Sequence, residues 1–168
     1  WTLRLFDVGD VHRAEVAYAW WLAGIKRPEC VLWFYSRSFV EPEILKKLAL
    51  LAELPNVRGF LSFDRENYKE GLKAYKRYPE VFSVAVMQEK PSPQVKKMLL
   101  EIERVVPEKR LVVFPVHKGP FHVEPLKTKG VVCPQVLGQY ELVNEPDREK
   151  PCQSCRVCLP RPPSQLGV

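Results

Sequence analysis

The chain contains a nearly continuous run of apolar residues, Val31-Leu32-Trp33-Phe34-Tyr35, followed at once by the polar Ser36-Arg37-Ser38. β-Branched and aromatic residues favour strands, and a strand without polar alternation is typical of one that is covered on both faces. Parallel sheets have this composition because their crossover helices pack on the sheet. The run therefore predicts a buried strand of a parallel α/β sheet.

The same strand and helix pattern repeats on both sides of this run. Further strands are expected at 3–6, 57–63, 81–87 and 111–116. Between them, apolar residues recur at the three- and four-residue spacing of helices, at 13–25, from Pro42, around Tyr68 to Tyr75 and from Pro93. Five such units are too few for a closed eight-stranded barrel. We therefore expect α/β architecture with parallel βα repeats in an open or partial barrel, and a flat doubly wound sheet as the alternative.

The C-terminal part of the chain breaks this pattern. After about Lys118 the sequence is rich in proline and glycine, beginning with Gly119-Pro120, and contains no convincing helix. We expect two parts, a parallel α/β domain at 1–118 and an irregular, Pro-rich, metal-binding tail at 119–168 that packs on it.

Composition narrows the classes of partner. The 168 residues carry a net charge of +6, which allows nucleic acid or an anionic small molecule as a partner. No apolar run approaches the roughly eighteen residues that a membrane span requires, so we expect no membrane partner. Five cysteines, four of them in a metal-site pattern, indicate a reducing compartment, and we expect a cytoplasmic protein.

The four cysteines are Cys133, which Pro134 follows, and the closely spaced Cys152, Cys155 and Cys158. Three thiolates at Cys-x-x-Cys-x-x-Cys spacing plus a remote cysteine before proline favour an iron-sulfur cluster, with 4Fe-4S as the expected type. Structural zinc is the alternative, since four thiolates also suit Zn²⁺, and disulfides or free thiols come third. Because such a site is often only a structural clamp, the pattern predicts a metal without deciding whether the protein is an enzyme.

Polar residues follow the end of each expected strand, where parallel α/β folds place their functional sites. If the strand ends lie along the same edge of the sheet, the polar residues that follow them form one rim at that edge. We expect the metal at or near this rim. The residues are Asp7, Asp10 and His12; Ser36 and Arg37; Asp64 and Arg65; Gln88, Glu89 and Lys90; His117 and Lys118. The candidates for catalysis among them are Asp7, Asp10, Arg37, Asp64, His117 and Lys118. The alternative is that these loops are polar because they face water.

The stretch after the first strand, one histidine and the fifth cysteine each suggest a specific role. Asp7-Val8-Gly9-Asp10 could bind a divalent cation or a ribose, whereas the structural alternative is a turn in which Asp10 caps the next helix. His122 could ligate metal, although a histidine without fixed spacing is weak support. Cys30 precedes the second strand at the opposite end of the sheet and is expected to be a buried apolar thiol.

Several of these stretches together resemble a phage-encoded family called gene product eighty-eight. They are Arg4-Leu5-Phe6-Asp7-Val8-Gly9-Asp10, Phe34-Tyr35-Ser36-Arg37-Ser38, Asn56-Val57-Arg58, Ser62-Phe63-Asp64 and the terminal cysteines. The resemblance implies a partial barrel related to the radical S-adenosylmethionine fold, and, if the protein is viral, the cytoplasm of a host cell. It directs attention to Asp7, Gly9, Asp10, Tyr35, Ser36, Arg37, Asp64 and the four cysteines.

Three functions follow as hypotheses. The first is an iron-sulfur protein with a polar pocket at the strand ends and a role in redox chemistry or with nucleic acid. The second is a basic nucleic-acid-binding module with a structural cluster or zinc, in which phosphates contact Lys127, Lys129, Arg156 and Arg161. The third is a remnant of a radical S-adenosylmethionine enzyme, or a zinc-clamped scaffold. The Cys-x-x-x-Cys-x-x-Cys motif of radical enzymes is absent from the sequence.

Overall fold

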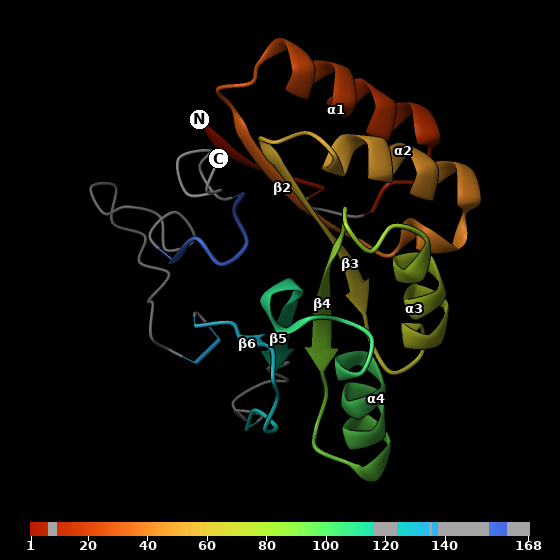
Figure 1. Ribbon diagram of the computed structural model, residues 1–168, viewed down its shortest axis with the longest axis vertical. Helices are drawn as coiled ribbons and strands as arrows, with labels where there is room; N and C mark the ends of the chain where they lie inside the picture. Colours follow the sequence, from red (N-terminus) through yellow and green to blue (C-terminus); the bar gives the residue numbers. More distant parts are fainter. Residues whose placement is uncertain (7–9, 116–123, 135, 138–154, 161–168) are drawn as a thin grey trace.

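A computed structural model describes residues 1–6, 10–115, 124–134, 136–137 and 155–160. Its centre is an open sheet of six parallel strands that lie side by side in the order of the sequence (Figure 1). The strands are β1 (Thr2–Leu5), β2 (Val31–Ser36), β3 (Val57–Phe63), β4 (Ser83–Gln88), β5 (Leu111–Pro115) and β6 (Val131–Val132). The prediction of parallel βα repeats that do not close into a full barrel is confirmed. The doubly wound alternative is wrong, because it requires a reversal of strand order.

Within the described ranges, four helices lie on the same side of this sheet (Figure 1). This follows from the strand order, since successive right-handed crossovers in one direction place every helix on one face. The helices are α1 (Ala14–Lys26), α2 (Pro42–Ala52), α3 (Tyr68–Arg77) and α4 (Pro93–Glu103), with short 3₁₀ turns at Ser38–Val40 and Glu108–Arg110. No helix in the described ranges is long and apolar enough to cross a membrane.

Local sequence explains why these helices form where they do. Pro42 and Pro93 occupy first turns, where a missing N–H costs nothing. Ser92 caps α4 by accepting the Val95 N–H at 3.2 Å. The main core forms where the helix stripes meet one set of strand side chains, with Phe34, Leu61 and other residues fully buried.

Alternate strand residues point to the opposite face, which we call the distal face. The register aligns Arg4, Trp33 and Arg58 in one row and Tyr35, Phe60 and Ser83 in the next. The distal face also carries Ser62, Ala85, Met87, Val112 and Phe114. A smaller apolar cluster of Phe60, Ala85 and Val112 lies here, separate from the main core.

Strand β6 lies within the segment that we expected to be irregular. It pairs in parallel with β5, Val131 beside Val112 and Val132 beside Val113. The approach to it is held by Glu103, whose Oε1 accepts the Thr128 hydroxyl at 2.7 Å and the Lys129 N–H at 2.8 Å. A two-residue strand has no readable periodicity, so only its tertiary contacts identify it. The predicted tail therefore contributes to the sheet itself.

The contact between α3 and β3 leads to a prediction for Gly71→Ala. A Cβ at Gly71 would lie 2.2 Å from Cε1 of Phe63, a ring that is fully buried. Alanine favours a helix by about 1 kcal/mol over glycine, but overpacking costs about 1–3 kcal/mol. We expect a lower free energy of unfolding in urea. Lys73→Ala, at an exposed position on the same helix, is the control and should change the free energy by less than about 0.5 kcal/mol. A Gly71→Ala protein as stable as the wild type would contradict this packing.

Candidate functional site

The carboxylate of Asp10 connects the chain after β1 to the end of β2. Its Oδ1 accepts the Val11 N–H and the Ser36 hydroxyl, each at 2.7 Å, and its Oδ2 accepts the Arg37 N–H. Ser36 itself is buried. The expectation that Asp10 caps the next helix is wrong, because α1 begins at Ala14 and the residue before it, Arg13, makes no side-chain cap bond. Asp10 instead binds the end of the neighbouring strand β2.

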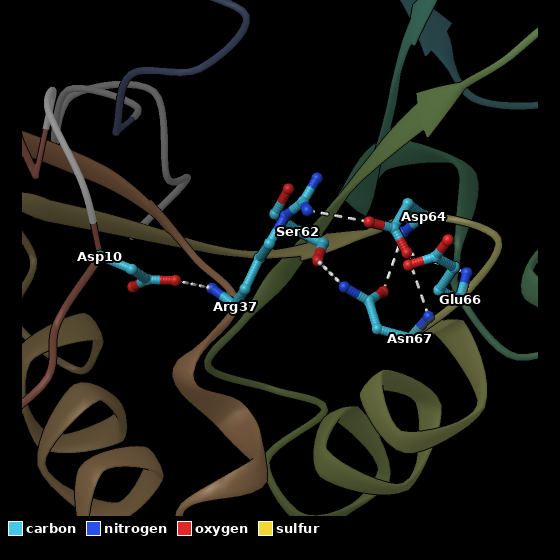
Figure 2. Close-up of polar contacts among 6 residues, drawn as sticks. All are labelled: Asp10, Arg37, Ser62, Asp64, Glu66 and Asn67. Atoms are coloured by element: carbon cyan, nitrogen blue, oxygen red, sulfur yellow. Dashed lines mark hydrogen bonds and ion pairs between the residues drawn. The ribbon is translucent and has the colours of Figure 1, made fainter.

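Arg37 carries the connection on to the end of β3, as Figure 2 shows. Its Nη1 lies 2.9 Å from Oδ2 of Asp64, whose other oxygen accepts the N–H groups of Glu66 and Asn67 at 2.9 and 3.0 Å. The expected rim residues Asp10, Ser36, Arg37 and Asp64 are thus brought together. These side chains bind one another and backbone N–H groups of their own loops. The network therefore stabilises the loops that follow the strands.

The remaining rim residues are more dispersed. Gln88 is buried, donates to the Glu124 carbonyl at 2.9 Å and accepts the Leu126 N–H at 3.0 Å. It therefore holds residues 124–126 beside β4. Arg65 and Glu89 form a loose ion pair at 3.7 Å. His12 and Lys90 are exposed. The predicted residues Asp7, Gly9, His117, Lys118 and His122 lie outside the described residues.

The distal face brings together two of the predicted cysteine ligands. Cys133 directly follows β6, and its N–H donates to the Val113 carbonyl at 2.9 Å. Cys158 comes from the C-terminal segment 155–160. Both half-buried thiols pack against the small cluster of Phe60, Ala85 and Val112. Residues far apart in the sequence therefore meet on one apolar patch of the sheet.

Arg58 fastens the backbone around Cys158 to strand β3. Its Nη1 donates to the carbonyls of Val157 at 2.7 Å and Leu159 at 3.3 Å, the two residues that flank Cys158. Its guanidinium lies 5.0 Å from the centre of the Phe60 ring, and its Nε and Nη2 lie 3.4 Å from the Ser83 hydroxyl. Sequence reasoning assigned Arg58 no role. The available signal was a charge inside an otherwise apolar strand.

Tyr35 approaches the same thiols from strand β2. Its ring packs against Phe60 at 5.1 Å and edge-on against Phe114 at 5.7 Å, and the Arg4 guanidinium lies 5.2 Å from its centre. Burial raises the pKa of Tyr35, as do the nearby Cys158, which accepts a hydrogen bond from the hydroxyl, and Cys133, whereas Arg4 lowers this pKa. Tyr35 is therefore a protonated hydrogen-bond donor at neutral pH.

The described residues supply part of the predicted metal site. Cys133, Cys155 and Cys158 are half-buried and free of disulfides, but no three His, Cys, Asp or Glu side chains converge on a metal-sized centre within the ranges that the structure describes. Cys152 lies outside them. Cys30 is half-buried rather than buried, and it packs at the edge of the main core, on the helix-covered face. The full ligand set stays a prediction.

Comparison with known proteins identifies the family. The family described as Gene product 88 matches residues 1–161, so the chain belongs to it and the predicted resemblance is confirmed. No curated protein and no solved structure matches the chain.

The Asp10 network predicts that Asp10→Ala destabilises the fold. The substitution leaves the buried Ser36 hydroxyl and the Arg37 N–H without their acceptor, a loss that typically costs about 1–3 kcal/mol. Urea unfolding should show this decrease, while Glu53→Ala, an exposed acidic residue at the end of α2, should change stability by less than about 0.5 kcal/mol. Equal effects of the two substitutions on stability would show that Asp10 does not stabilise the fold.

The contacts of Arg58 predict faster proteolysis of the Arg58→Ala protein. Without the two carbonyl bonds beside Cys158, trypsin should cut after the exposed Arg156 about tenfold faster, because bonds to a charged donor contribute about 1.5–3 kcal/mol. Mass spectrometry of timed digests measures the rate. Arg104→Ala, at the exposed end of α4, is the matched control and should be cut at the wild-type rate. The same rate in both variants would show that Arg58 does not hold the segment.

Proposed function

We propose that this member of the Gene product 88 family is an iron-sulfur protein that holds a 4Fe-4S cluster against the distal face of its sheet. The ligands are Cys133, Cys152, Cys155 and Cys158. The observation that carries the proposal is that Cys133, after β6, and Cys158, from the C-terminal segment, pack on the same patch of Phe60, Ala85 and Val112.

The surroundings of these two thiols suit such a group. Four thiolates at this spacing are the donor set that iron-sulfur clusters use. The apolar patch limits access of water, which is one of the factors that set the potential of a cluster. Arg58 and the pairing of β6 hold the two ligand-bearing segments on the sheet. When bound, a cluster would supply one-electron transfer and would also link the two segments through its ligands.

Nucleic-acid binding is a second candidate function, favoured by the positions of exposed basic residues. Lys127 and Lys129 precede β6, and Arg156 lies between Cys155 and Cys158, so charges accompany both ligand-bearing segments. A cluster or zinc would then order a basic surface. A steep loss of affinity for a nucleic acid with rising salt would support this function.

The third hypothesis is a remnant of a radical S-adenosylmethionine enzyme. Its only support is that the parallel strands follow the order of the sequence, as they also do in an open barrel. Binding of S-adenosylmethionine to the purified protein tests it directly. Absence of binding at millimolar ligand would remove this reading and leave the iron-sulfur proposal unaffected.

The proposal predicts the metal content of the protein. Protein purified without oxygen should be brown and contain about four irons and four acid-labile sulfides per chain. A colourless protein with one zinc would contradict the cluster and make the cysteines a structural clamp.

Two cysteine variants locate the site. Cys155→Ser should lose the iron and sulfide, because it removes a predicted ligand, whereas Cys30→Ser should retain both, because Cys30 packs at the main core on the other face. Iron and sulfide assays on the two proteins provide the comparison. Full iron in the Cys155→Ser protein would exclude that residue from the ligand set.

A further inference from the structure

Helix α1 presents an apolar surface to solvent. Tyr18 and Leu22 are each 40% exposed, and Ile25 is 48% exposed. The exposed residues of α3, by contrast, are all charged: Lys69, Glu70, Lys73, Lys76 and Arg77. A helix that is apolar on its outer side as well as its inner side is normally covered by other protein. The outer side of α1 is therefore a candidate interaction surface.

The position of α1 leaves its outer side accessible. The helix follows β1, the first strand in the order of the described sheet, and lies at the end of the row of helices with α2 beside it (Figure 1). Its buried residues are Ala17 and Gly24. Towards α2, the Tyr18 ring stacks on Trp21 at 5.2 Å and has Nζ of Lys47 4.7 Å from its centre. Contacts within the chain thus already hold this aromatic side chain in place.

Opposite the buried residues, a line of exposed side chains runs along α1. It consists of Glu15, Ala19, Leu22 and Lys26, whose spacings of four, three and four residues place them on one side of a helix. Read from its other end, the line has lysine in place of glutamate and leucine in place of alanine. Two copies packed antiparallel therefore place Glu15 opposite Lys26 and Leu22 opposite Ala19, and each pair occurs twice. The line is self-complementary in charge and in size.

We propose that α1 is the interface of a symmetric dimer, in which its outer side packs antiparallel against α1 of a second copy of this chain. A two-fold interface uses the same patch on both subunits, so the patch must be self-complementary. The antiparallel arrangement also sets the positive end of each helix dipole beside the negative end of the other. Tyr18 and Ile25 flank the line on the α2 side and enlarge the contact. The dimer does not depend on the proposed cluster.

The expected strength follows from the size of the contact. Helix α1 has 13 residues and is about 20 Å long, whereas stable interfaces bury about 1,200–2,000 Å² in total. We therefore expect a reversible dimer with a dissociation constant in the micromolar range. Sedimentation velocity of the whole chain from about 1 µM to about 1 mM measures it. A reductant is kept present, because the free cysteines could otherwise link two copies.

Charge reversal at the ends of the line tests the antiparallel pairing. Glu15→Lys places lysine opposite lysine at both ends and should weaken the dimer about tenfold. Lys26→Glu places glutamate opposite glutamate and should weaken it by a similar factor. An equimolar mixture of the two variants should dimerise as strongly as the wild type, because each end again pairs lysine with glutamate. Glu70→Lys, the same change at an exposed position of α3, is the matched control and should dimerise like the wild type.

The alternatives give different results. A protein that stays monomeric over the whole concentration range overturns the proposal, and the apolar side of α1 would then be free or bind a different protein. A dimer that Glu15→Lys does not weaken also overturns it, because that dimer must use another surface. A mixture that dimerises no better than the single variants overturns the antiparallel pairing.

A second pair of variants covers the case in which charge reversal at the helix ends unfolds α1, which circular dichroism would detect. Leu22→Glu changes an exposed residue in the middle of the line to another good helix former. This protein should be monomeric over the whole range. Leu100→Glu, at a leucine of α4 that is 56% exposed, is the matched control and should dimerise like the wild type. Equal dimerisation of these two variants would overturn the proposal.

Discussion

The structure depends on a sheet whose helices α1 to α4 all pack on one face. Consecutive parallel strands produce this arrangement, and it leaves the aromatic side chains of the distal face to be covered in another way. Phe60 is fully buried there, and Trp33 is nearly so. Segments that follow α4 provide cover, through Cys133, Val157 and Cys158. Arg58 joins the segment around Cys158 to the sheet by hydrogen bonds to the carbonyls on both sides of Cys158.

The polar rim and the distal face have different characters. At the rim, Asp10, Arg37 and Asp64 link the ends of three successive strands (Figure 2). Their charged groups bind other groups of this network. On the distal face, Tyr35, Arg58 and the thiols of Cys133 and Cys158 meet around apolar side chains. For this reason the proposed cluster site lies on the distal face, whereas the described rim residues hold the strand ends together.

The sequence predicts those features that depend on short-range patterns. The apolar run at β2, the proline-started helices α2 and α4, and the open parallel sheet are confirmed because periodicity and crossover geometry determine them locally. Strand β6 is too short for a pattern. Asp10 binds Ser36 and Arg37, more than twenty residues away at the end of another strand, and Arg58 binds the carbonyls of Val157 and Leu159, about a hundred residues away. Cysteine spacing predicts a ligand set, but only the fold places Cys133 and Cys158 against the same apolar cluster.

The most direct measurement is a crystal structure of anaerobically purified protein with anomalous diffraction data at the iron edge. The account predicts one compact group of iron peaks on the distal face, bonded to Cys133 and Cys158 and adjacent to Phe60 and Tyr35. Anomalous signal at the zinc edge only, or iron bound elsewhere on the molecule, would contradict it.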